Sequence, residues 1–161
     1  MSMIDPDNYR FRFLKVVDEL RVALGYPLRT EDPEPGEDLA MEMMYGGFDF
    51  AVVHSLAKSP ERILIECIFG EIPEGKPEAV MSRLLEMNAA LAEVDGSVFC
   101  LNEQGTKLLY TLALDLQALE GSDLLKRMTE IVWHGRRWLE TRYLNDRASD
   151  RSELLNPVQL A

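Results

Sequence analysis

The chain has 161 residues and a formal net charge of −11, and 47% of its residues are hydrophobic and 28% charged. This length suits one domain with its own core, and the composition excludes a disordered chain and a membrane-spanning one. Because phosphate recognition needs a basic stripe and the sequence shows none, we expect neither a nucleic-acid nor a membrane partner.

The N-terminal residues MSMIDPDNYR contain acids and an early proline. A signal peptide has basic residues and then an apolar segment, so we expect a cytoplasmic protein. The two cysteines, Cys67 and Cys100, lie far apart in strand-like apolar runs. We interpret them as reduced, buried thiols rather than a disulfide or metal ligands.

The first predicted element is a helix that begins at Asp5 and Pro6, which are suited to the cap and the first helical position, and ends near Gly25. Its apolar face is formed by Tyr9, Phe13, Val16, Val17, Leu20 and Leu24. Residues 27–38 contain several prolines and acids. They predict an extended loop inside one domain rather than a linker.

Strand-like alternation then runs from Leu39 to Leu56, and Gly46 and Gly47 interrupt it. Two glycines between alternating runs predict a β-hairpin. The following run RILIECIFG is rich in branched and aromatic residues, with apolar side chains at both alternating sets of positions. It predicts a third, more central antiparallel strand.

A second helix is predicted over residues 77–94, between the breaker stretch IPEGKPE and the pair Asp95 and Gly96. Two strands, SVFCLN and KLLYTLALDL, follow around the turn EQGT, and a last amphipathic helix begins near Ser122. The order predicts an α+β fold, helix, three strands, helix, two strands, helix, with an antiparallel sheet covered by helices. We expect one domain over residues 1–144 and a polar, flexible tail over 145–161.

The apolar residues of the second helix occupy about half of its circumference at about 100° per residue. One ridge is spaced like a heptad seam and consists of Val80, Leu84, Met87, Leu91 and Val94, and a second consists of Met81, Leu85 and Ala92. This arc is wide for a helix that covers one sheet. Either the helix is buried on two sides of one core, or one ridge faces the core and the other a second copy of the chain.

Asn88 is a polar residue within this apolar arc. A buried amide without a partner costs about 1–3 kcal/mol, so we expect hydrogen bonds to backbone or to another side chain. Two interpretations remain open. The amide either ties the helix to the next strand or sets the register of self-association, as buried asparagines do in coiled coils.

No catalytic motif is present. The two histidines, His54 and His134, belong to no HExxH or Cys/His pattern, and the glycines form no phosphate-binding loop. We therefore expect a protein that is not an enzyme and that uses no metal or other cofactor.

The sequence resembles the class I chaperones of type III secretion systems, the Tir-chaperone or CesT-like family. The resemblance runs from about Tyr9 to Tyr143 and rests on the Leu24–Gly25 step, FGEIPEG, LLEMNAAL, GSVFCLNEQGTKLLYTLALDL and a last helix that ends with Trp138. Residues 27–38 and 145–161 are not part of the recognised pattern.

This resemblance implies a bacterial, acidic, cytoplasmic homodimer, a virulence-associated chaperone that keeps the N-terminal region of a secreted effector soluble and extended. We expect the dimer interface at Val80, Met81, Leu84, Leu85, Met87, Asn88 and Leu91. We expect the effector at Phe11, Leu14, Met41, Met43, Met44, Ile63, Ile65, Phe69 and Leu109, on the reasoning that strands with two apolar faces leave some of them exposed. The alternative is an adaptor or regulator of the same fold, outside secretion, that binds a folded protein.

Overall fold

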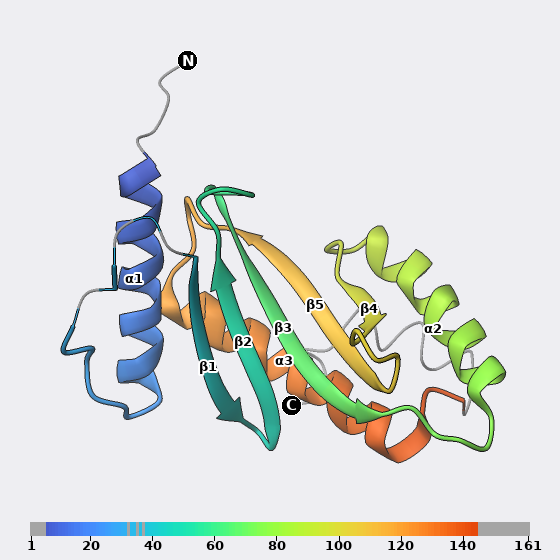
Figure 1. The fold of residues 1–161 in the computed structure, drawn as a ribbon. Helices are drawn as coiled ribbons and strands as arrows, with labels where there is room; N and C mark the ends of the chain where they lie inside the picture. Colours follow the sequence, from blue (N-terminus) through green and yellow to red (C-terminus); the bar gives the residue numbers. More distant parts are fainter. Residues whose placement is uncertain (1–5, 32, 35, 37, 145–161) are drawn as a thin grey trace.

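The computed structural model describes residues 6–31, 33, 34, 36 and 38–144. These residues form three helices and five strands: α1 (Pro6–Ala23), β1 (Leu39–Tyr45), β2 (Phe48–His54), β3 (Arg62–Glu71), α2 (Pro77–Ala92), β4 (Val98–Leu101), β5 (Lys107–Asp115) and α3 (Gly121–Thr141). The predicted α+β class and the order of elements are confirmed (Figure 1). Asp5 and the predicted tail lie outside the described residues.

The strands form one antiparallel sheet in the order β1-β2-β3-β5-β4, with β3 in the centre as its two-sided apolar sequence predicts. The hairpin between β1 and β2 pairs Tyr45 with Phe48 across Gly46 and Gly47, whose φ angles are +61° and +90°. Positive φ at both turn positions is the requirement of a type I′ hairpin, which glycine meets without strain. The predicted Gly-Gly hairpin is therefore confirmed.

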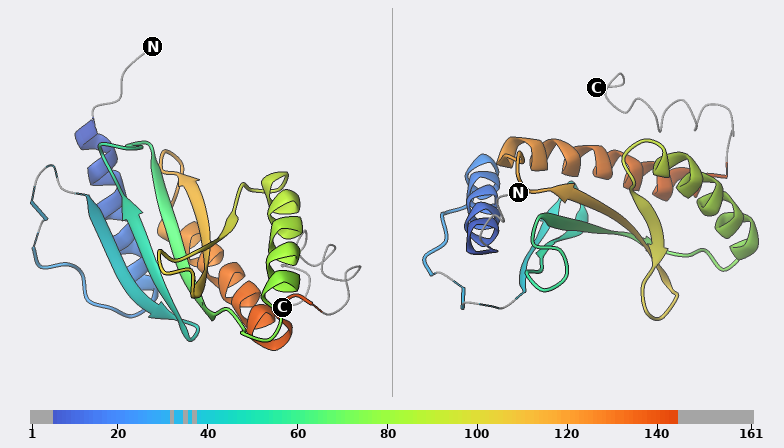
Figure 2. Two further views of the ribbon diagram at one scale, coloured as in Figure 1. Left: turned by 45° about the vertical axis from the view of Figure 1, so that its right-hand side comes forward. Right: turned by 90° about the horizontal axis from the view of Figure 1, so that it is seen from above.

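Two helices, α1 and α3, lie on the same face of the sheet, whereas α2 lies beside β4 (Figure 2). The contact between α1 and α3 is close at Gly121, where an added Cβ would come within 2.4 Å of Cβ of Glu19. The Glu19 carboxylate also accepts a hydrogen bond from the Gly121 backbone N–H at 2.8 Å. A negative charge at a helix N-terminus is stabilising, so Glu19 fixes the start of α3 against α1.

The last helix begins two residues earlier than an N-cap at Ser122 predicts. Its N-cap is Glu120 rather than Ser122, and Glu120 and Asp123 form a capping box in which each side chain accepts from the other residue's backbone N–H. Ser122 lies inside the first turn instead. The pattern of apolar residues predicted the helix, but the cap depends on side-chain rotamers that the pattern does not specify.

The core lies between the sheet and the helices, and it takes one of the two apolar faces of each central strand. Ile63, Ile65 and Phe69 all point into it and are at most 1% exposed. The prediction that these three residues form an exposed effector-binding patch is wrong. Their face of β3 is the one covered by helices, and the other face, with Leu64 and Ile68, is the accessible one.

Candidate protein-binding surfaces

Large apolar side chains that remain exposed gather in three regions of the described structure. The first lies on α1 and the loop after it, the second on the uncovered face of the sheet, and the third around α2, β4 and the end of α3. These side chains are Phe11, Val22, Tyr26 and Leu28; Met44 and Ile68; and Leu85, Val94, Val98, Leu101, Leu139 and Leu144. Since single exposed apolar residues are normal but grouped ones mark interaction sites, each region is a candidate surface.

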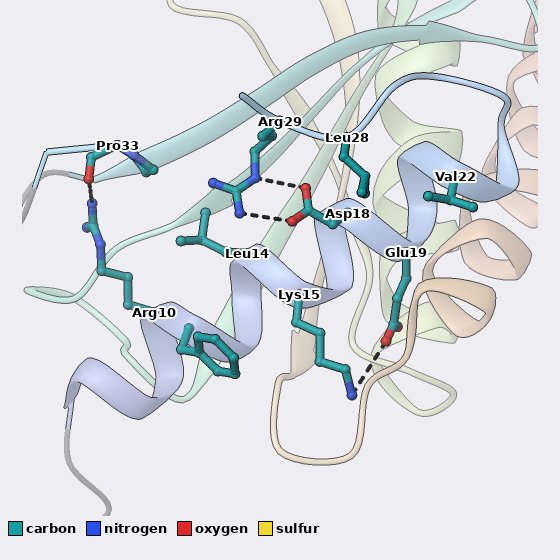
Figure 3. Close-up of a pocket in the computed structure, with 10 residues that line it drawn as sticks. Arg10, Leu14, Lys15, Asp18, Glu19, Val22, Leu28, Arg29 and Pro33 are labelled. Atoms are coloured by element: carbon teal, nitrogen blue, oxygen red, sulfur yellow. Dashed lines mark hydrogen bonds and ion pairs between the residues drawn. The ribbon is translucent and has the colours of Figure 1, made fainter. Parts of the chain in front are cut away.

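The first region is a groove of about 920 Å³ between α1 and the loop that follows it, here called the α1 groove (Figure 3). Phe11 and Leu14 contribute from α1 and Leu28 from the loop. Phe11 is 69% exposed, and Leu14 is half-buried against the core. Both residues were predicted to meet the partner, and the structure places them side by side in one concavity.

Three arginines hold the loop on α1 and so shape the α1 groove. Arg29 forms a bidentate ion pair with the Asp18 carboxylate, with donor–acceptor distances of 2.8 and 3.0 Å. Arg10 donates to the Pro33 carbonyl at 3.0 Å (Figure 3). Arg21 donates to the Pro27 carbonyl at 2.9 Å. Bidentate arginine–carboxylate pairs restrict geometry more than single contacts do, so the loop has a defined position as a wall.

The edge of the sheet at β1 lies next to this groove. Among the described residues, β1 pairs only with β2, so its other edge has unpaired backbone groups. A smaller hollow of about 420 Å³ runs from α1 to β1 and is lined in part by Leu14, Leu39 and Met41. An apolar groove beside a free strand edge can take an extended peptide, which pairs its backbone with the edge and places side chains in the groove.

The methionines of β1 divide between the two faces of the sheet. Met41 and Met43 are half-buried on the helix side, packed against the core, whereas Met44 is 67% exposed on the opposite face. Leu109 is half-buried on that opposite face as well. The predicted effector-binding residues are thus not one patch, because alternation along a strand sends neighbouring side chains to opposite faces.

On α2 the two apolar ridges have different environments. Val80, Leu84, Met87 and Leu91 are buried inside the subunit, whereas Leu85 is 70% exposed and Met81 is half-buried. The assignment of the four buried residues to a dimer interface is therefore corrected: they fill the core of their own subunit and have almost no surface left for another. The exposed ridge with Met81 and Leu85 is the part of α2 that remains available.

Asn88 joins α2 to the edge of β4. Its amide nitrogen donates to the Phe99 carbonyl at 3.0 Å, and its amide oxygen accepts from the Phe99 N–H at 2.7 Å. Both Phe99 backbone groups point away from β5 at this position, so the side chain takes the place of a neighbouring strand. The interpretation of Asn88 as a tie between helix and strand is confirmed, and it also closes part of an otherwise open sheet edge.

Both histidines are buried. Cys67 is buried as well, whereas Cys100 is only half-buried, so the prediction of two buried thiols holds for Cys67 alone. Nε2 of His54 lies 2.8 Å from the Pro60 carbonyl, and its ring stacks on Phe13. Burial under Tyr110 lowers the pKa of His134 to about 4. Burial raises the pKa of the Cys67 thiol, which disfavours the reactive thiolate.

The described residues contain no group of three or more His, Cys, Asp or Glu residues placed to hold a metal ion. No helix among them is long and apolar enough to cross a membrane. The exposed apolar side chains of the described residues lie in grooves and on a helix ridge.

The described residues form a small α+β fold with exposed apolar side chains in three regions. The model of the Tir chaperone protein (CesT) family matches residues 39–139. The chain belongs to this family, which confirms the resemblance found in the sequence.

Solved structures of similar fold come from complexes. A chain of the ExsC–ExsE complex has a TM-score of 0.62 and 15% identity, with 86% of this chain and 96% of that chain covered. A chain of the HopA1–SchA chaperone–effector complex has a TM-score of 0.57 and 16% identity, with 84% and 98% covered. At these identities the likeness shows the fold. No curated protein sequence matches significantly.

Sequence reasoning missed several exposed residues. Leu28 lies in the loop, where no periodicity exists to mark it, and Ile68 lies on the second face of β3. Val98 and Leu101 of β4 are exposed on opposite faces of a four-residue strand. The two-sided apolar pattern of β3 was the available signal for Ile68, but it did not show which side the helices cover.

Proposed function

We propose that this protein is a cytoplasmic, homodimeric chaperone of a type III secretion system that binds the N-terminal chaperone-binding region of a secreted effector. Membership of the Tir chaperone protein family and the fold shared with a chain of a chaperone–effector complex support the proposal. It involves no covalent step: the chaperone keeps an extended segment soluble by covering its apolar side chains.

The α1 groove is the observation that carries this proposal. It combines exposed Phe11, the half-buried Leu14 and the loop residue Leu28 with the nearby edge of β1, which pairs with no strand among the described residues. An effector segment in extended form would place apolar side chains in the groove and pair backbone groups with β1. A folded partner has few free backbone groups to offer, so this geometry favours an unfolded segment.

The exposed ridge of α2 is the proposed dimer interface. Leu85 and Met81 lie on its outward side, and β4, the strand beside α2, exposes Leu101 on the same face as the buried Phe99. A helix ridge can pack against the same ridge of a second copy about a twofold axis, which buries these side chains on both subunits. Two copies of the chain then present two α1 grooves to one effector.

The test is to tag the protein in its native host, identify what co-purifies, and ask whether the partner's isolated N-terminal segment binds. We expect a secreted protein whose N-terminal segment suffices. A folded regulator that binds only when intact would contradict the secretion proposal and support the adaptor.

Variants of the α1 groove sharpen this test. Phe11→Asp and Leu14→Asp should each lower the yield of partner, because a charge in the groove must be desolvated when an apolar side chain binds. Ala57→Asp is the control, since Ala57 is exposed in the turn after β2, does not line the groove and belongs to none of the three regions. Equal partner yields from Phe11→Asp, Leu14→Asp and the control would contradict the α1 groove as the binding site.

A further inference from the structure

The sheet has a face that no helix of the described residues covers, opposite α1 and α3 (Figure 2). The strand register arranges its side chains in three rows across the sheet. They are Met44, Asp49, Ile68, Leu109 and Cys100; Glu42, Ala51, Glu66, Thr111 and Val98; and Ala40, Val53, Leu64 and Ala113. Most of these residues are apolar. Beyond the three rows, the same face carries Arg62 and Lys107, which pair in register with Asp115 and Glu71.

Part of this face is hollowed into a groove of about 550 Å³, here called the acidic groove. Met44, Ile68 and Leu109 supply its apolar surface. Glu42, Asp49 and Glu66 stand among them, one on each of β1, β2 and β3. The groove thus combines apolar surface with three carboxylates from adjacent strands.

The three carboxylates have no compensating partner among the described residues: none of them forms an ion pair or a hydrogen bond there. The α1 groove differs, because its acids Asp18 and Glu19 are paired with Arg29 and Lys15. Uncompensated carboxylates around an apolar surface attract a cationic partner and repel an anionic one. The charge of the acidic groove therefore favours apolar partners that also carry positive charge.

We propose that the acidic groove binds a second, basic amphipathic section of the effector. Apolar side chains of that section contact Met44, Ile68 and Leu109, and its lysines or arginines lie beside Glu42, Asp49 and Glu66. Methionine suits such a surface because its flexible side chain adapts to different shapes. The proposal rests on the proposed function. It adds that the effector binds through two sections, one in the α1 groove and a basic one on the sheet face opposite α1 and α3.

The test uses two synthetic amphipathic peptides of identical leucine pattern, one with lysines and one with glutamates at the polar positions. Methyl NMR of the intact protein reports on Met44, Ile68 and Leu109. We expect the lysine peptide to shift these methyl signals at low salt, with weaker binding at high salt because ions screen exposed charges. The glutamate peptide should leave the signals unchanged.

A charge-matched pair of variants separates the groove from the overall acidity of the protein. Glu42→Gln/Asp49→Asn/Glu66→Gln should weaken binding of the lysine peptide on the order of tenfold, because three exposed ion pairs are lost. Glu74→Gln/Glu93→Gln/Glu140→Gln removes the same charge from exposed positions outside the groove and should bind like the unmodified chain. Equal weakening in both variants, or methyl shifts confined to the α1 groove, would overturn the proposal.

The effector segment found by co-purification separates the two proposals. If Phe11→Asp abolishes its binding and the groove variant leaves it unchanged, the basic second section is refuted and the chaperone proposal stands. If no secreted partner binds at all, the proposed function fails, and the peptide titration still decides whether the acidic groove selects basic amphipathic chains.

Discussion

The α1 end and the α2 end of the molecule both expose apolar side chains, but their shapes differ. At the α1 end, Phe11 and Leu14 line a concave groove with a wall that arginines hold in place. At the α2 end, Leu85 stands on the convex outer side of a helix whose other ridge is buried. Similar residues therefore serve different kinds of contact.

Shape decides which partner can bury each surface. A concave groove surrounds a side chain on several sides, so a single extended segment gains enough contact to bind. A convex ridge contacts a flat or flexible partner poorly, but it interdigitates with another helix ridge. This difference favours an unfolded segment at the α1 end and a second copy of the chain at the α2 end.

The largest expected effect is on the free energy of unfolding, and it should differ between the buried and the exposed ridge of α2. Leu84→Ala should lower the free energy of unfolding by about 3 kcal/mol, because it leaves a cavity in the core. Leu85→Ala leaves the core intact, but in the proposed dimer it should still cost more than the roughly 0.5 kcal/mol of an exposed site, because a second copy covers Leu85. Urea unfolding at several protein concentrations measures both.

Light scattering on Leu85→Asp completes this comparison. The unmodified chain should be a dimer at micromolar concentration, and Leu85→Asp a folded monomer, because a charged side chain cannot be buried unpaired between two subunits. A monomeric unmodified chain, or a Leu85→Asp variant that stays dimeric, would contradict an interface on the exposed ridge.

The second effect is a loss of folding stability at acidic pH, which is caused by His134 in α3. His134 has its pKa lowered to about 4 by burial, against an ordinary value of 6.5, so the unfolded chain binds more protons between these values. The stabilisation that the neutral His134 ring contributes is fully present above pH 6.5, and it is lost as the pH falls toward 4. The loss amounts to about 3 kcal/mol.

Denaturant titrations between pH 7 and 4 measure this loss. Carboxylates also titrate in this range, so the relevant quantity is the difference from His134→Phe, which keeps a ring against Tyr110 without a titrating group. The stability of the unmodified chain relative to His134→Phe should rise by about 3 kcal/mol between pH 4 and pH 7. Parallel curves for the two proteins would show that His134 does not carry the effect.

The third effect concerns the tie between α2 and β4. Asn88→Ala removes both hydrogen bonds to Phe99 and should lower the free energy of unfolding by about 2 kcal/mol. Hydrogen exchange of the Phe99 amide should become faster, whereas amides of the central strand β3 should keep their protection. An unchanged Phe99 exchange rate would mean that the side chain does not close the edge of β4 in solution.

The smallest effect on stability is expected at the wall of the α1 groove. Asp18→Asn weakens the bidentate pair with Arg29, which is partly exposed, so the free energy of unfolding should change by less than about 1 kcal/mol. Affinity for the effector segment should nevertheless fall several-fold, because the loop that carries Leu28 loses its fixed position.

A charge exchange is the control for this prediction. Asp18→Arg combined with Arg29→Asp should recover part of the affinity that either single change removes. Isothermal titration with the effector segment compares the three variants. If all of them bind like the unmodified chain, the wall has no role in recognition.

Several parts of the fold were predictable because they depend on local patterns. The glycines at 46 and 47 predicted the hairpin, since a two-residue turn of this type needs positive φ. The surplus of apolar residues on α2 left two interpretations open, and the structure shows one buried ridge and one exposed ridge. Asn88 was left with two interpretations, and only the position of β4 beside α2 showed that its amide bonds to the Phe99 backbone.

Other features depended on which faces the helices cover. A strand such as β3 has apolar residues on both sides, and its sequence is compatible with either side facing the core. Ile63, Ile65 and Phe69 were therefore assigned to a surface that is in fact buried. The same ambiguity assigned Leu84 and Leu91 to an interface between subunits, although they fill their own core.

The sequence by itself determined the order of helices and strands, the hairpin, the central place of β3 and the family, because periodicity and turn chemistry act over a few residues. Only the tertiary structure decided where surface remains. The α1 groove brings a loop onto a helix, and the acidic groove brings carboxylates together from three strands. Such neighbours arise from packing between elements, and packing depends on the whole chain rather than on any local pattern.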